Sequence, residues 1–151
     1  MSAAEDRRWL DVAVEQARIG AEEGGVPIGA ALVADGQLLG AGRNRRVQQQ
    51  SPILHGETDA LAAAGRLPAR TYARATMYTT LSPCAMCTGA ILLYGIPRVV
   101  IGEHVTFVGE EQLLRSRGVE VVVLDDPDCR KLMEAFARDH PQLWHEDIGE
   151  D

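Results

Sequence analysis

Two cysteines spaced three residues apart, Cys84 and Cys87, follow Pro83 in the stretch LSPCAMCTGA. Such a pair could form a disulfide, a redox couple of the thioredoxin type, part of a structural metal site or part of a catalytic one. The chain has an odd number of cysteines, and the third, Cys129, lies among charged residues of another predicted helix. We therefore disfavour a disulfide framework and interpret Cys129 as a packed or exposed thiol.

A histidine and a glutamate two residues apart precede this pair in LHGE. Imidazole and thiolate are common zinc ligands, so His55, Cys84 and Cys87 can supply three ligands to one ion. Three protein ligands leave a fourth position for water, which is typical of a catalytic zinc. Glu57 can exchange protons with that water. The full combination predicts a hydrolytic zinc centre, although the position of the cysteines between a strand and a helix would by itself also suit a redox pair.

The spacing of His55 and Glu57 raises a geometric question, because residues two apart on a regular helix point about 200° away from each other. Both can face one ion if His55 lies at the helix entry, outside regular helical geometry. We expect Gly56 to make that turn possible. The two cysteines are expected to share one face of their own helix, whose N-terminal dipole favours thiolates.

Hydrophobic periodicity and turn residues predict the elements that position these residues. An amphipathic helix is expected within 5–25, and a hairpin over 26–44 turns at Asp35-Gly36. Further helices are expected within 56–66, 84–95, 128–140 and 141–151, and further strands at 75–81, 98–102 and 119–126. The last two strands have continuous apolar runs, which predicts burial on both faces. This order predicts one α/β domain over residues 1–151, with helices on both faces of one sheet.

Composition and charge limit the classes of function. Hydrophobic residues make up 46% and charged residues 25% of the 151 residues, as in ordinary globular proteins. No apolar run approaches the ~20 residues that cross a bilayer, and the first residues lack the apolar core of a signal peptide. We therefore expect a cytoplasmic protein with no membrane partner.

The net charge of −7 gives no overall attraction to nucleic acid, and the basic stretch GRNRR (42–46) is interpreted as a solvated turn.

The order H-x-E, then P-C-x-x-C, is the signature of zinc deaminases. The chain further resembles the zinc-dependent cytosine deaminases of fungal type, within the cytidine-deaminase-like superfamily. This resemblance runs from EEGGVPIGA through LHGE and YTTLSPCAMCTGAILLYGIPR to WHEDIGE, over nearly the whole chain. It implies a three-layer αβα fold with a mixed five-stranded sheet and one Zn²⁺ per subunit. It also implies a homodimer whose interface lies near the apolar helix CAMCTGAILLYG.

The resemblance assigns roles to residues of the shared motifs. It implies zinc binding by His55, Cys84 and Cys87, and proton transfer by Glu57. The other implied residues would contact the substrate: Asn44 and the Gly56 N–H at the ring, the Ser82 carbonyl and Asp147 at the amino group, and Ile28, Phe107, Trp144 and Ile148 as apolar lining and lid.

The implied reaction is the hydrolytic deamination of free cytosine to uracil and ammonia. Hydroxide generated at the zinc would attack C4, while Glu57 would deliver protons to ring N3 and to the leaving amino group. Another small amino-heterocycle (creatinine, isocytosine or guanine) is an alternative substrate, and adenosine in tRNA is a further one supported only by GRNRR. A non-catalytic zinc module would have no need of Glu57. We expect a nucleobase as the partner, and no nucleic acid.

Overall fold

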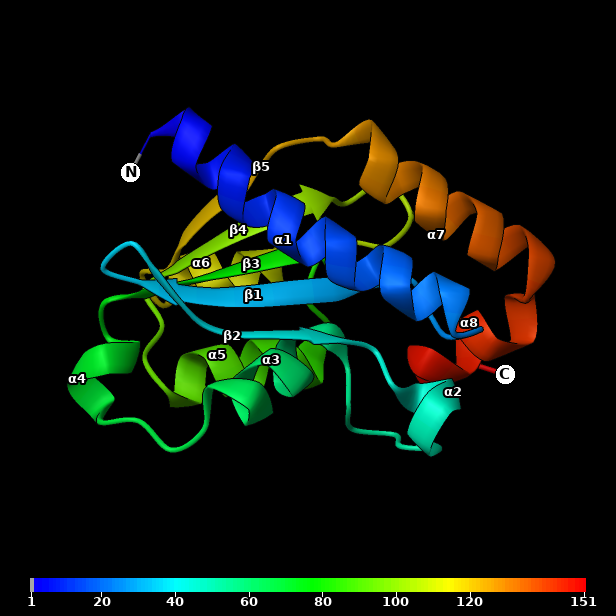
Figure 1. Ribbon diagram of the computed structural model, residues 1–151, viewed down its shortest axis with the longest axis horizontal. Helices are drawn as coiled ribbons and strands as arrows, with labels where there is room; N and C mark the ends of the chain where they lie inside the picture. Colours follow the sequence, from blue (N-terminus) through cyan, green and yellow to red (C-terminus); the bar gives the residue numbers. More distant parts are fainter. Residues whose placement is uncertain (1) are drawn as a thin grey trace.

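The computed structural model describes residues 2–151, which form three layers with a sheet between two layers of helices (Figure 1). The sheet has five strands in the order β2-β1-β3-β4-β5: β1 (Gly29–Ala34), β2 (Gln37–Arg43), β3 (Ala75–Leu81), β4 (Arg98–Glu103) and β5 (Glu120–Val123). β1 is antiparallel to both β2 and β3, whereas β3, β4 and β5 run parallel. The predicted mixed five-stranded αβα architecture is thus confirmed.

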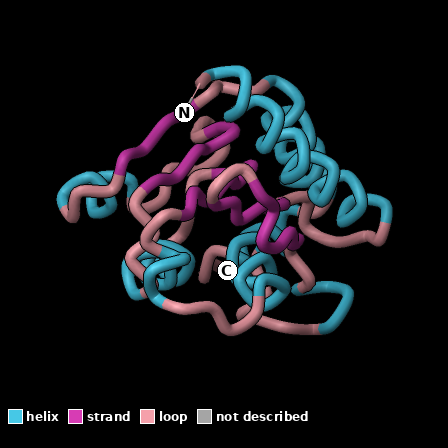
Figure 2. The backbone as a smooth tube through the Cα atoms, turned by 60° about the vertical axis from the view of Figure 1, so that its left-hand side comes forward, coloured by secondary structure: helices cyan, strands magenta, loops and turns pink. Residues whose placement is uncertain are grey.

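The helices of the described chain are α1 (Ala3–Glu22), α2 (Arg46–Gln49), α3 (Gly56–Ala64), α4 (Ala69–Tyr72), α5 (Ala85–Leu93), α6 (Glu111–Ser116), α7 (Pro127–Asp139) and α8 (Pro141–Asp147). Helices α1 and α7 cover one face of the sheet, and α3 and α5 cover the other (Figures 1 and 2). Trp9 and Cys129 lie in the core on the first face, and Ile91 and Leu114 in the core on the second. Of the two positions left open for Cys129, packed or exposed, the structure shows the packed one.

Local signals set the ends of several elements, although α1 begins two residues before the expected stretch. Ser2 caps α1 by accepting a hydrogen bond from the Glu5 N–H at 3.1 Å. Gly24, with φ +82°, follows the end of that helix. Asp35 and Gly36 both have positive φ, at 52° and 71°, which is the geometry of a tight turn matching the twist of a hairpin.

The predicted burial of the strand at 119–126 is wrong. β5 covers only Glu120–Val123, lies at the edge of the sheet beside β4, and has three half-buried valines. The other strand of this pair, β4, is buried as expected. An apolar run reports the hydrophobicity of a strand but not the number of its neighbours, so it does not separate edge strands from central ones.

The interpretation of 42–46 as a solvated turn is also wrong. Arg43 ends β2, and its Nε bonds Glu23 Oε1 at 2.8 Å. Arg45 pairs with Asp59, and Asn44 between them is fully buried. Arg43 and Arg45 are thus held by carboxylates of the chain itself. No helix among residues 2–151 is long and apolar enough to span a membrane.

Candidate active site

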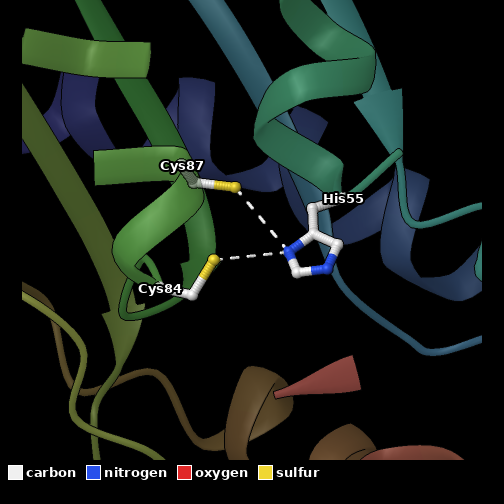
Figure 3. A group of neighbouring side chains, drawn as sticks. All are labelled: His55, Cys84 and Cys87. Atoms are coloured by element: carbon white, nitrogen blue, oxygen red, sulfur yellow. Dashed lines mark hydrogen bonds between the residues drawn. The ribbon is translucent and has the colours of Figure 1, made fainter. Parts of the chain in front are cut away.

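The first residues of α3 and α5 meet, and each helix places a metal-binding side chain at its beginning (Figure 3). His55 is the N-cap of α3 and has an extended backbone, with φ −80° and ψ 171°. Its N–H donates to Thr58 Oγ1 at 2.9 Å, which fixes the chain at this entry. The expected position of His55 outside regular helical geometry is confirmed. It allows His55 and Glu57 to face one site.

Cys84 is likewise an N-cap, with φ −68° and ψ 176°, so it precedes α5 instead of lying inside it. Cys87 lies in the first turn and is fully buried. The expectation that both cysteines lie on one face of a regular helix is therefore wrong in detail. The cap position nevertheless points both sulfur atoms toward His55 (Figure 3).

The donor atoms are spaced as a zinc ion requires. His55 Nδ1 lies 3.5 Å from Cys84 Sγ and 3.7 Å from Cys87 Sγ. Nitrogen and sulfur ligands at ordinary zinc bond lengths in a tetrahedron lie about 3.6 Å apart. All three donor atoms fall within 4.8 Å of one another. The three residues thus fit one Zn²⁺ and leave a fourth direction open.

The second ring nitrogen of His55 meets a carboxylate from the C-terminal helix. His55 Nε2 lies 3.3 Å from Asp147 Oδ1, and the Asp147 side chain is almost wholly buried. A carboxylate on the far nitrogen of a metal-binding histidine fixes the ring orientation and its tautomer. Burial alone would lower the pKa of His55, but the bonds to Asp147 and then Cys84 outweigh it and raise the pKa to about 10.

Glu57 lies in the first turn of α3 and is buried beside the cysteines. Burial is the main cause that raises the pKa of Glu57 to about 7, and the negative charge of Cys84 adds to it. A carboxyl group whose pKa lies near neutrality can both accept and return a proton at physiological pH. This is the property expected of the proton carrier.

Gly56 is required for a different reason from the one expected. It begins α3 without a positive φ, so it provides no unusual backbone turn. A Cβ atom at this position would lie 3.1 Å from the Gly29 carbonyl carbon and 3.3 Å from Ile28 O. Glycine therefore permits close packing of the start of α3 against the start of β1.

The two cysteine thiols have unlike proton affinities. The hydrogen bond from Cys87 is the main cause that lowers the pKa of Cys84 to about 4. Its place at the N-terminus of α5 also favours a thiolate there. The bond to Cys84 and burial raise the pKa of Cys87. Cys84 is therefore ready to bind a cation, and Cys87 would release its proton when a metal binds.

A small cavity opens beside these groups. It is lined by His55, Glu57 and Cys84 together with six residues that the sequence assigned to the substrate and one more apolar residue: Ile28, Ser82, Phe107, Trp144, Asp147, Ile148 and Leu81. Phe107 and Trp144 meet edge to face, with ring centroids 6.1 Å apart. The structure thus brings residues from five distant parts of the sequence, between Ile28 and Ile148, together around one small cavity.

Asn44 reaches this cavity through Asp147. Its Nδ2 donates to Asp147 Oδ1 and Oδ2, both at 3.1 Å, and its Oδ1 accepts from the Arg46 N–H at 2.9 Å. Asn44 is fully buried. From sequence alone, an asparagine beside several arginines is interpreted as a turn residue. In the structure its side-chain amide is held at the wall of the site.

Two acidic residues near the site carry no sequence signal. Glu111, buried, accepts a hydrogen bond from Ser82 Oγ at 2.6 Å. Asp59, in α3, contacts the chain on either side of Asn44. Neither belongs to a motif, and their partners are 29 and about 15 residues away in the sequence.

The chain matches known deaminases. Residues 3–103 match the family model described as the cytidine and deoxycytidylate deaminase zinc-binding region. A cytosine deaminase of Candida albicans is 56% identical over 97% of this chain and 98% of that protein. A tRNA-specific adenosine deaminase of Bacillus subtilis is 31% identical over 89% of this chain and 90% of that protein.

A solved structure titled as guanine deaminase from Nitrosomonas europaea superposes with a TM-score of 0.70, covering 91% of this chain and 86% of that one at 26% identity. The family model, the relatives and the three-ligand cluster agree on one zinc ion and on hydrolysis of a carbon–nitrogen bond. The chain belongs to the zinc-dependent cytidine and deoxycytidylate deaminase family.

Proposed function

We propose that this enzyme deaminates free cytosine to uracil and ammonia, as a single zinc-dependent domain. The observation that carries the proposal is the small cavity over Glu57 and Cys84, which the C-terminal residues Trp144, Asp147 and Ile148 help to line. The similarity to the Candida albicans cytosine deaminase extends through this segment, since it covers 97% of the chain.

In this proposal His55, Cys84 and Cys87 hold the metal. When bound, Zn²⁺ supplies a hydroxide nucleophile at neutral pH by lowering the pKa of water. Glu57 would take up the proton that this releases and donate it to ring N3, which makes C4 more electrophilic. After the hydroxide oxygen has added to C4, the same carboxyl group would take the proton of the new C4 hydroxyl and pass it to the amino group. The C4–N bond then breaks, ammonia leaves and the C4 carbonyl of uracil forms. The Glu57 pKa of about 7 suits both directions of transfer.

The remaining polar groups would orient the base. The Ser82 hydroxyl already donates to Glu111 and accepts from the Gly109 N–H, so its backbone carbonyl is the group offered to the amino group. Asp147 would lie on the same side, and Asn44 and the Gly56 N–H would hold the ring. Phe107, Trp144, Ile148 and Ile28 would exclude water.

The chief alternative is another small amino-heterocycle, and guanine has support from the structural similarity to the Nitrosomonas europaea guanine deaminase. Editing of tRNA is disfavoured because the net charge of −7 gives no overall attraction to nucleic acid. Ammonia release should be measured with cytosine, cytidine, isocytosine, creatinine and guanine. We expect the highest kcat/KM with cytosine, loss of activity on chelation and recovery with Zn²⁺. A higher kcat/KM with guanine would overturn the assignment.

We further propose that the enzyme is a homodimer formed through α5. This helix, AMCTGAILL, has no charged residue, yet Leu93 is 74% exposed and the adjoining Tyr94 is 44% exposed. Helices that are apolar on all sides are normally buried. A second copy of the chain is the occupant that the family resemblance implies.

Leu93→Arg should therefore convert the dimer to a monomer, as measured by sedimentation equilibrium at micromolar concentration, because a charge would be buried in the interface. Leu38→Arg is the matched control, since Leu38 is 44% exposed on the hairpin away from α5. A wild-type mass equal to one chain would contradict this proposal.

A further inference from the structure

Asp59 connects the helix that carries the metal histidine to the end of β2. Its Oδ2 accepts a hydrogen bond from the Arg43 N–H at 2.9 Å and another from Arg45 Nε at 2.9 Å. Its own N–H donates to His55 O at 2.9 Å. One carboxylate oxygen of Asp59 therefore holds the residues on both sides of Asn44. The backbone of Asp59 is itself hydrogen-bonded to His55.

The bonds of Asn44 itself run to other parts of the molecule. Its N–H donates to Ile28 O at 3.0 Å, its Oδ1 accepts from the Arg46 N–H, and its Nδ2 donates to Asp147. These bonds fix Asn44 relative to β1 and α8. Three bonds hold the residues next to Asn44 near the start of α3: the two to Asp59, and the one from the Arg45 N–H to Leu54 O at 2.8 Å.

The approach of α3 to β2 is unusually close at this point. A Cβ atom on Gly42 would lie 2.3 Å from Ala60 N and 2.5 Å from the Asp59 carbonyl carbon. Glycine is therefore needed at position 42 for the helix backbone to pack directly on the strand. The Asp59 side chain is only 12% exposed, so its bonds to Arg43 and Arg45 are shielded from water.

We propose that Asp59 is a positioning residue for substrate binding, which sets Asn44 at its working distance from His55 and Glu57. This inference rests on the proposed function, in which Asn44 holds the pyrimidine ring. Asp59 does not line the cavity, so it would act through Asn44 and not on the base itself. Loss of Asp59 should affect binding of the base more than the chemical step.

The test compares Asp59→Ala, Asp59→Asn, Asn44→Ala and the double variant with the wild-type zinc enzyme. We expect Asp59→Ala to raise KM for cytosine by about tenfold, the scale of one lost hydrogen bond to a charged group. Zinc content and kcat should stay near wild-type values. Asp59→Asn should have a smaller effect, because its side-chain oxygen can still accept from the Arg43 N–H.

Glu23→Ala is the matched control, because it removes the partner of the Arg43 guanidinium and leaves the bonds to Asp59 intact. It should leave KM unchanged. If Asp59 acts through Asn44, the double variant should be no worse than Asn44→Ala alone. Additive losses in the double variant, or a loss of zinc and kcat in Asp59→Asn, would overturn the inference.

The outcomes separate this inference from the proposed function. An unchanged KM in Asn44→Ala would refute the substrate contact and with it the inference. A raised KM in Asn44→Ala together with an unchanged KM in Asp59→Ala would refute the inference alone. Where Asp59→Ala does not fold, Arg45→Met removes one of the two bonds and should raise KM by a smaller factor.

Discussion

Asp147 contacts both a metal-binding residue, His55, and an expected substrate-binding residue, Asn44. Its carboxylate lies 3.3 Å from His55 Nε2 and accepts two bonds from Asn44, and it also lines the cavity. Glu57 stands apart from this network and is surrounded by Cys84, His55 and Cys87. At the level of single residues, one buried carboxylate orients the site and the other is free to exchange protons.

Replacing Glu57 by Gln should therefore lower kcat for deamination by at least about a hundredfold, because the amide cannot carry a proton. Zinc content should be unchanged, since Glu57 is not among the three clustered ligands. Ammonia release and metal analysis of the purified variant check both expectations. Glu15→Gln, on the exposed surface of α1, is the control. Near-normal turnover in Glu57→Gln would contradict the proposed mechanism.

At the level of elements, the start of α6 fixes the connection between β3 and α5. Glu111 accepts from the Ser82 hydroxyl at 2.6 Å, and that hydroxyl accepts from the Gly109 N–H at 2.9 Å. The Glu110 N–H also donates to Pro83 O at 3.1 Å. The segment that carries Ser82 and Cys84 is thus held by a short helix that follows it by about 30 residues.

Glu111→Ala should lower the free energy of unfolding by about 2 kcal/mol, because it leaves the buried Ser82 hydroxyl without its charged acceptor. It should also lower kcat/KM, because the Ser82 backbone would no longer be held in place. Urea denaturation and steady-state kinetics measure the two effects. Gln112→Ala, at the exposed neighbouring position, should change neither quantity. Equal stability of the two variants would show that the bond does not fix this segment.

At the level of the whole molecule, a buried ion pair ties α1 to the sheet. Arg98 Nη1 and Nη2 donate to the two oxygens of Asp6 at 2.7 Å, and the Tyr78 hydroxyl donates to Asp6 at 3.0 Å. The hydrogen bond from Arg98 is the main cause that lowers the pKa of Asp6 below its ordinary value of 3.8. The stability from this pair is therefore complete above that value and is lost as the pH falls through the lower pKa of the folded chain.

Asp6→Asn should lower the free energy of unfolding by about 2 kcal/mol at pH 7, because the half-buried Arg98 loses its buried charged partner, and Glu120, which it also bonds, is exposed. The difference from the wild type should narrow as the pH is lowered below about 4, where Asp6 of the unfolded wild-type chain is itself protonated. Denaturant unfolding at several pH values checks this. Asp11→Asn, on the exposed side of α1, should change stability by less than about 0.5 kcal/mol. A difference independent of pH would contradict the account.

The sequence determined the features that depend on short spacing. H-x-E and P-C-x-x-C identified all three clustered metal-binding residues, and helical and strand periodicity predicted the layers and the order of the longer elements. The helices α2, α4 and α6 were missed because four to six residues are too few to establish a period. The resemblance to a known family supplied the substrate residues, whose individual roles stay predictions.

Only the tertiary structure decided how distant residues meet. The bond from Asn44 to Asp147 joins positions 103 apart, and the bonds of Asp59 to Arg43 and Arg45 join α3 to β2. The same holds for β5, whose apolar run reads as a central strand although it lies at an edge. Local sequence determines which side chains are available and whether each segment forms a helix, a strand or a turn. Which of them share a buried space depends on packing between segments, and that information lies in no single stretch of the chain.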